Sequence, residues 1–144
     1  MSDKTFIFQD EEAPYSQIGA TLEALSNVIA CRHDAGVESY TATLLRGNID
    51  ELLKKIAEEA SEVILAAKDV ESTVETDSAI NTSDAAVDHL RYEAADLLYH
   101  LLVLLGRCNI PLEELAAELN MRMTDEERPH GAVCLLDKHI KRGK

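Results

Sequence analysis

The sequence predicts an all-α protein, a bundle of about four to five helices whose core is completed by oligomerisation. The 144-residue chain has only six glycines and three prolines, and its abundant Ala, Leu and Glu favour helices. Apolar residues recur at helical spacing in several segments, and no segment of any length alternates as a strand would. The length fits one domain, near the size at which oligomerisation often helps to complete a core.

The chain divides into three parts. Residues 1–14 are expected to form an acidic N-terminal arm, residues 15–123 the all-α domain, and residues 124–144 a C-terminal tail with a basic end. The apolar run "AVCLL" within this tail either docks on the body of the protein or stays mobile.

The first helix is expected to follow Pro14 and to end near Gly36, because apolar residues recur at helical spacing between them. The segment 37–47 is either a connector or a short helix. Asn48, followed by Glu51 three residues later, resembles a capping box. It predicts the start of a helix that runs to about residue 69.

Residues 70–83 are polar and rich in Ser and Thr, so we expect a loop or insertion there. The next helix should span about 84–108. Its part from 97 to 105 is apolar nearly all round, which is typical of a helix buried on every side. In a chain this small, that pattern indicates that a second copy covers it. Pro111 should then occupy the first position of a short amphipathic helix.

The net charge of −13 limits the partners. Nucleic acids need a basic face and anionic membranes attract basic segments, so both are expected not to bind. An anionic small-molecule substrate remains possible, because a bound cation can invert the local field. The longest apolar run is too short for a bilayer, no signal peptide is visible, and the three distant cysteines suggest reduced thiols in the cytoplasm.

Acidic side chains cluster on two of the expected helices. Glu58, Glu59 and Glu62 lie within about one turn of the first, and Glu93 and Asp96 lie three residues apart on the second. If the two helices are antiparallel, four or five carboxylates converge on one point. Such a group cannot remain fully ionised without a cation.

Hard oxygen ligands suit Mg²⁺, Ca²⁺ or Mn²⁺. Lys54, Lys55 and Lys68 lie on or near the same helix and could hold phosphate groups, so the pattern favours a nucleotide pyrophosphate as substrate. The alternative is that the acids form a solvated helix face, because two glutamates three residues apart are common by chance. Their position among apolar residues favours the metal site, since acids at the edge of a core are costly.

His100 lies in the apolar helix, one turn beyond Asp96. A core histidine that is hydrogen-bonded, with Asp96 as a possible partner, is favoured over a metal ligand. Neither acidic motif contains the Glu-x-x-His pattern of di-iron bundles.

Three blocks, "SYTATLL" at 39–45, "LLKKIAEEASEVILAAKD" at 52–69 and "YEAADLLYHLLVLL" at 92–105, closely resemble the phosphoribosyl-ATP pyrophosphohydrolase family of histidine biosynthesis. This family belongs to the all-α NTP pyrophosphohydrolases, whose signature is ExxE followed later by ExxD. The resemblance covers roughly residues 22–123. It implies Mg²⁺-dependent hydrolysis of the α-β phosphoanhydride of phosphoribosyl-ATP, giving phosphoribosyl-AMP and pyrophosphate, by a homodimer or higher homo-oligomer.

The resemblance also implies roles for individual residues, because the family motifs match position by position. Glu58, the leading acid, is a candidate to orient or deprotonate the attacking water, and a metal role is equally open. The remaining assignments are metal ligation by Glu59, Glu62, Glu93 and Asp96, and substrate binding by Ser39, Tyr40, Thr41, Lys55 and Lys68.

Two other functions compete with this one. The first is a house-cleaning enzyme of the same superfamily that hydrolyses dNTPs or damaged nucleotides, and the "SYTATLL" block argues against it. The second is a non-catalytic acidic helical scaffold, in which the carboxylates are only a solvated face.

Overall fold

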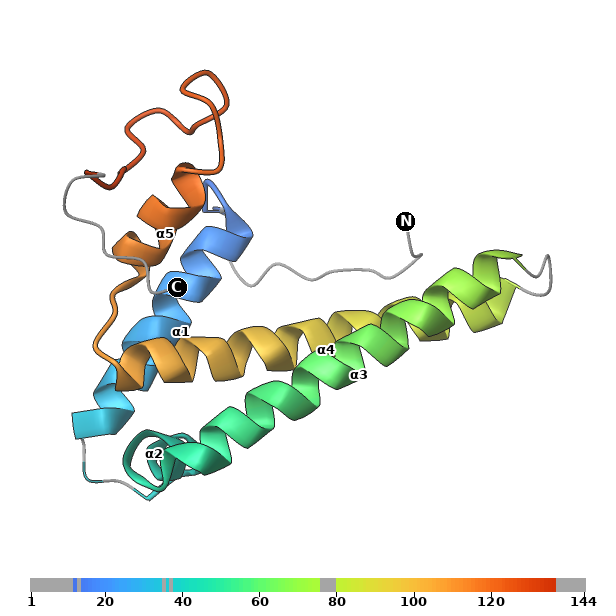
Figure 1. Ribbon diagram of the computed structural model, residues 1–144, viewed down its shortest axis with the longest axis horizontal. Coiled ribbons are helices and arrows are strands. Elements are labelled where there is room, and N and C mark those ends of the chain that lie inside the picture. Colours follow the sequence, from blue (N-terminus) through green and yellow to red (C-terminus); the bar gives the residue numbers. More distant parts are fainter. Residues whose placement is uncertain (1–11, 13, 35, 37, 76–79, 137–144) are drawn as a thin grey trace.

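The computed structural model describes residues 12, 14–34, 36, 38–75 and 80–136, and these residues form five helices and no strand (Figure 1). The all-α class and the expected number of helices are therefore confirmed. In chain order the helices are α1 (Gln17–Asp34), α2 (Tyr40–Arg46), α3 (Ile49–Glu75), α4 (Ile80–Arg107) and α5 (Leu112–Asn120).

Helices α3 and α4 form a long antiparallel hairpin that dominates the packing of the molecule (Figure 1). They contain 27 and 28 residues, so each is about 40 Å long. The predicted start of α3 is confirmed, but the Asn48 side-chain oxygen accepts a hydrogen bond of 3.0 Å from the backbone N–H of Asp50 rather than from that of Glu51, as a capping box would require. The hairpin brings two distant acidic segments of the chain side by side.

The loop predicted over 70–83 is mostly helical, so that prediction was wrong in its extent. Helix α3 continues to Glu75 and α4 begins at Ile80, and the intervening residues 76–79 lie outside the described part of the chain. The segment contains no Gly or Pro. Ser and Thr cost a helix only a few tenths of a kcal/mol each, while each added residue gains a backbone hydrogen bond. Polarity alone therefore does not end a helix.

The core lies where α1 and α2 meet one end of the hairpin. Gly106 allows α1 to approach α4 closely, because a Cβ atom there would lie 3.1 Å from Cγ2 of Ile29. The buried hydrophobic cluster consists of Ile29, Leu44, Leu45, Leu52, Leu102 and Val103.

Helix α2 has only seven residues, too few to be stable alone, and its neighbours hold both of its ends. At its start the Ser39 hydroxyl caps it by accepting a hydrogen bond from the Ala42 N–H. At its end the Arg107 guanidinium of α4 donates to the carbonyl oxygens of Leu44 and Gly47, both at 2.8 Å. Of the two alternatives for this segment, the short helix is confirmed.

The segment after α5 docks on the body of the protein. Asn120, buried at the end of α5, donates a side-chain hydrogen bond of 2.8 Å to the carbonyl of Val133, which lies in the "AVCLL" run. Pro111 occupies the N-cap of α5 with an extended ψ of 155° rather than the first helical position expected. The tail beyond residue 136 and the arm, apart from residues 12 and 14, are outside the described residues.

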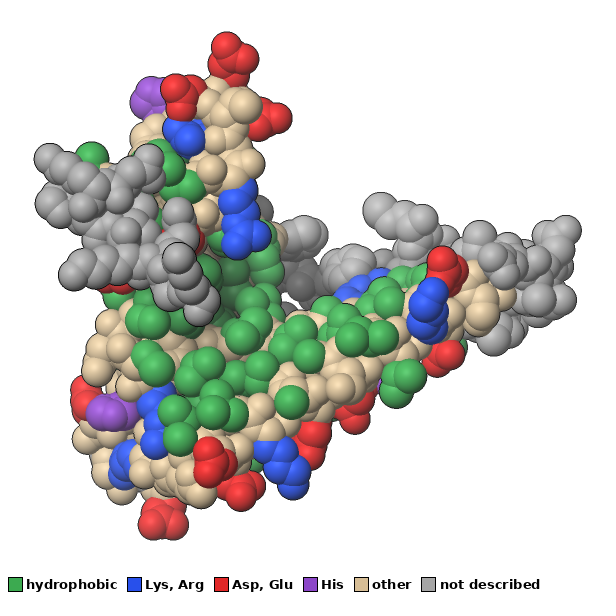
Figure 2. Space-filling model, in the orientation of Figure 1, with side chains coloured by type: hydrophobic (Ala, Val, Ile, Leu, Met, Phe, Trp, Pro, Cys, Tyr) green, Lys and Arg blue, Asp and Glu red, His purple; other side chains and the backbone are tan. Residues whose placement is uncertain are grey.

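Large hydrophobic side chains remain exposed along the hairpin. On α3, Leu53, Ile64 and Leu65 are 43%, 64% and 65% exposed, and Leu101 of α4 is 38% exposed. Figure 2 shows hydrophobic side chains running along one face of the hairpin. No single helix among the described residues has the length and apolar character of a membrane span; α4 from Ala85 and α5 pass the criterion only together, at an angle of 115°.

Candidate metal centre

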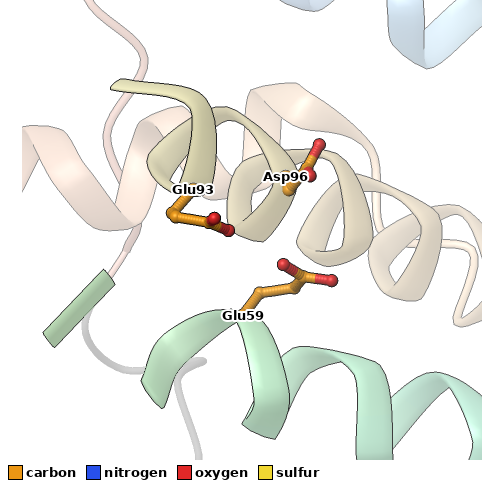
Figure 3. A group of neighbouring side chains, drawn as sticks. All are labelled: Glu59, Glu93 and Asp96. Carbon is orange, nitrogen blue, oxygen red and sulfur yellow. The ribbon is translucent and has the colours of Figure 1, made fainter. Parts of the chain in front are cut away.

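Three carboxylates converge between the middle parts of α3 and α4. Glu59 projects from α3 toward Glu93 and Asp96 of α4 (Figure 3), and one oxygen of each lies within 4.8 Å of the others. Glu59 and Glu93 are only 5% and 7% exposed. The antiparallel pairing of the two acidic motifs, expected from their spacing, is what brings these side chains together.

The donor set fits a hard divalent cation. Oxygens around one Mg²⁺ are about 2.9 Å apart when adjacent and about 4.2 Å apart when opposite, and slightly farther around Ca²⁺. Small side-chain rotations would therefore bring all three carboxylates onto one ion. Carboxylates and water are also the ligands that Mg²⁺, Ca²⁺ and Mn²⁺ prefer.

The charge on Glu59 is only partly compensated by Lys55 and His100, each 3.8 Å from its carboxylate. Burial raises the pKa of its carboxyl group, and the neighbouring carboxylates of Glu62 and Asp96 raise the pKa further, while His100 acts in the opposite direction. A cation between the acids would remove this penalty on the charged form. This unfavourable clustering is what distinguishes the site from a solvated acidic helix face.

The two acids of α4 each have a neighbour on their own helix. The His89 side chain, one turn before Glu93, places its Nε2 atom 2.9 Å from Oε1 of Glu93. The carboxylate of Asp96 raises the pKa of the exposed Tyr92 phenol through its charge and through a hydrogen bond. Both neighbours are placed to orient an acid, as groups around metal ligands commonly do.

Beside the three-acid cluster, Glu58 pairs with basic residues. Its carboxylate lies 2.9 Å from the ammonium of Lys55 and 3.7 Å from that of Lys54. The hydrogen bond from Lys55 lowers the pKa of Glu58, and the same bond raises the pKa of Lys55. The Lys55 ammonium is also 3.8 Å from Glu59, so a positive charge borders the acids.

The block at the start of α2 lies against α4, close to the acids. The buried Thr41 hydroxyl accepts from the guanidinium of Arg32 at 2.9 Å and shares a 2.7 Å hydrogen bond with the hydroxyl of Tyr99. Tyr40, in contrast, is 56% exposed. Its pKa is raised, chiefly by desolvation of the phenol, and both Glu58 and Glu59 add to this effect. Ser39 uses its hydroxyl as the cap of α2.

Two predicted site residues lie outside the compact group. Glu62 is exposed. It raises the pKa of Glu59, but it is not one of the three acids whose oxygens lie within 4.8 Å of one another. The ammonium of Lys68 pairs with Glu71, and Lys68 lies nine positions after Glu59, which corresponds to about 14 Å along α3. Within the described residues, neither side chain joins the three-acid cluster.

Sequence reasoning missed several neighbours of this site. His89 could have been found, because it lies four residues before Glu93 on the same helix. Arg32 and Tyr99 gave no such signal, because each meets Thr41 only after the chain has folded.

Residues 22–123 match the family model for phosphoribosyl-ATP pyrophosphohydrolase. The chain belongs to this family. Among its curated relatives are proteins named phosphoribosyl-ATP pyrophosphatase from Rhizobium johnstonii and Pelobacter propionicus. They are 42% and 39% identical to it over 72% and 70% of this chain, and over 84% and 81% of their own lengths.

A longer relative is the histidine biosynthesis bifunctional protein HisIE of Bacillus subtilis. It is 40% identical over 83% of this chain, and this chain spans half of its length. No solved structure matches the chain. The part that matches the phosphoribosyl-ATP pyrophosphohydrolase family contains the three-acid cluster and all the predicted site residues.

Proposed function

We propose that this chain hydrolyses the α-β phosphoanhydride of phosphoribosyl-ATP to phosphoribosyl-AMP and pyrophosphate, the second step of histidine biosynthesis. The observation that carries the proposal is that the family match spans the whole three-acid cluster. Relatives with the corresponding name match this chain along more than four fifths of their own lengths.

In this proposal Glu59, Glu93 and Asp96 hold Mg²⁺, and Glu62 joins them as a fourth acid. When bound, the ion supplies charge neutralisation at the phosphates and lowers the pKa of coordinated water. Glu58 orients or deprotonates the attacking water. The pairing of Glu58 with Lys55 supports an ionised carboxylate that is ready to accept a proton, although its lowered pKa makes it a weaker base.

The substrate would lie across the start of α2 and the basic side of the cluster. Lys55 is placed to contact phosphate oxygens, since its ammonium borders Glu58 and Glu59. Tyr40 offers an exposed aromatic ring for the nucleoside. We assign Ser39 and Thr41 to holding Tyr40 in place, because their hydroxyls are used within the protein. Lys68 remains a proposed phosphate contact that would have to reach the substrate from farther along α3.

The decisive experiment measures pyrophosphate release, with and without Mg²⁺, from phosphoribosyl-ATP and from a panel of NTPs and dNTPs. Release from phosphoribosyl-ATP alone, dependent on Mg²⁺, is the expected result. Release from dNTPs instead would retain the site but make the protein a nucleotide house-cleaning enzyme. Release from none of these substrates would favour the acidic scaffold.

We further propose that the chain works as a homodimer or higher homo-oligomer in the cytoplasm. The exposed side chains of Leu53, Ile64, Leu65 and Leu101 support oligomerisation, because large apolar side chains exposed along a helix pair are typical of an interface. Free cysteines at positions 31, 108 and 134 are in line with a reducing compartment.

A further inference from the structure

The buried imidazole of His100 has a specific partner at each of its two nitrogens. It lies on α4, is 5% exposed, and places Nδ1 2.9 Å from the backbone oxygen of Asp96 and Nε2 3.3 Å from the hydroxyl of Tyr40. A carbonyl oxygen can only accept a hydrogen bond, so Nδ1 must carry the proton. In the neutral ring Nε2 is then the acceptor, and the Tyr40 hydroxyl donates to it.

The same ring lies next to the metal site. Its Nδ1 atom is 3.8 Å from Oε1 of Glu59, within ion-pair distance of that carboxylate. Two tyrosine rings fix the orientation of the imidazole through edge-to-face contacts. The Tyr99 ring lies 5.2 Å away at 76°, and the Tyr40 ring lies 6.3 Å away at 90°.

His100 has no role in the proposed hydrolysis, but its side chain connects the part of the site proposed to bind the nucleoside with the part proposed to bind the cation. Tyr40 begins α2 and is proposed to face the nucleoside, whereas Glu59 is proposed to hold the cation. Of the contacts found among the described residues, only those of the His100 imidazole join both side chains, at hydrogen-bonding distance from Tyr40 and at ion-pair distance from Glu59. Its anchor to the Asp96 carbonyl fixes it to the same turn of α4 that carries the third acid.

We infer that His100 is a positioning residue, which holds the Tyr40 side chain in register with the Glu59–Glu93–Asp96 cluster through its Nδ1-protonated tautomer. It touches neither substrate nor the reacting atoms. It aligns the aromatic group that meets the nucleoside with the acids that meet the phosphates. This inference rests on the proposed function for its effect on catalysis, but its geometry can be tested without any turnover.

The first test is a long-range ¹H–¹⁵N spectrum of the histidine side chains in the full-length protein. The expected result is an Nδ1-protonated His100, with an Nε2 resonance that moves in Tyr40→Phe, which loses the hydroxyl and keeps the ring. Tyr15→Phe is the matched control, because Tyr15 is fully exposed and should leave that resonance unchanged. An Nε2-protonated tautomer, or an Nε2 resonance that ignores Tyr40→Phe, would overturn the inference even if the enzyme is fully active.

The second test compares His100→Gln with His100→Leu by kcat and KM. A glutamine oxygen can take the place of Nε2 as acceptor for Tyr40, so we expect His100→Gln to retain more activity. His100→Leu should lower kcat/KM by about 10- to 100-fold, as is typical for residues that orient site groups. In the Tyr40→Phe background, His100→Leu should have little further effect. Equal losses in the two His100 variants, or additive effects with Tyr40→Phe, would show a role in packing alone.

Discussion

Glu59 is the residue at which the competing interpretations of the acidic cluster differ most. An exposed acid on a solvated face would ionise without a desolvation cost. Glu59 is instead buried against α4, and both burial and the adjacent carboxylates raise its pKa above the ordinary value of 4.5. Ionising the Glu59 carboxyl group in the metal-free protein therefore costs free energy. We propose that the site tolerates this cost because the ionised carboxylate binds the cation.

We predict that Glu59→Gln abolishes turnover, with a loss of at least about 100-fold, while keeping the fold. Without metal it should also be more stable than the wild type. The folded state binds the Glu59 proton more tightly than the unfolded chain, so wild-type stability falls as the pH rises from 4.5 through the folded pKa. Glutamine has no proton to lose. The stability of the variant relative to the metal-free wild type therefore increases over that pH window and then stays constant.

Thermal unfolding from pH 4 to 8 in EDTA, repeated with excess Mg²⁺, measures both effects. Mg²⁺ should raise the unfolding temperature of the wild type at neutral pH, and of the variant much less, because a ligand that binds only the folded state stabilises it. Identical Mg²⁺ shifts in the two proteins would show that Glu59 is not a ligand. Near wild-type turnover in the variant would show the same.

Lys55 allows a test of the phosphate side of the proposed site. Lys55→Met should lower kcat/KM by about 10- to 100-fold, since a charge-assisted contact to a phosphate contributes about 1.5–3 kcal/mol. It should also let the pKa of Glu58 rise, because the hydrogen bond from Lys55 is the largest cause of its depression. The acid limb of the pH–rate profile would then move to higher pH.

Lys54→Met is the matched control for this variant. Lys54 directly precedes Lys55 on α3, and its ammonium is 3.7 Å from Glu58, compared with 2.9 Å for Lys55. Within the described residues, Lys54 forms no ion pair with Glu59. Equal losses in kcat/KM for the two variants would indicate a general effect of positive charge and would remove the specific role of Lys55.

The helices themselves were largely predictable, because local signals determine them. Asn48 caps α3, Gly36 follows α1 with a φ of +64°, and the apolar spacing locates both arms of the hairpin. The loop over 70–83 was mispredicted because Ser and Thr favour loops only weakly. The convergence of the acids could also be anticipated, since the two motifs face each other if their helices pack antiparallel in the matching register. The contacts of α2 could not be, because Arg107 and His100 reach it from about sixty residues away.

Arg107 tests how this short helix is held. Its guanidinium donates to the carbonyls of Leu44 and Gly47, and Arg107→Met would leave both without that donor. We expect a loss of about 1–3 kcal/mol in the free energy of unfolding, or roughly 3–10 °C in melting temperature. Arg122→Met, at an exposed position after α5, serves as the control. Equal small changes in the two variants would show that α2 does not depend on Arg107.

At the scale of the whole molecule, the α3–α4 hairpin extends beyond the hydrophobic core, which packs against only one of its ends. The buried cluster lies at one end, where α1 and α2 pack, whereas the part of α3 beyond the acids exposes Ile64 and Leu65. Exposed apolar surface of this kind favours association, because burying it gains about 25 cal/mol per Å². Along the hairpin, the three-acid site lies between these two regions.

Leu65→Glu should therefore shift the protein toward monomer, measured by light scattering after size-exclusion chromatography. A charge placed in an apolar interface must be desolvated without a partner, which costs several kcal/mol. Leu136→Glu is the matched control, because Leu136 is 67% exposed, close to the 65% of Leu65, but lies in the segment after α5. If Leu65→Glu dissociates the oligomer and also lowers turnover, the second copy supports the site itself. An unchanged mass for Leu65→Glu, or dissociation by Leu136→Glu alone, would place the interface elsewhere than on the hairpin.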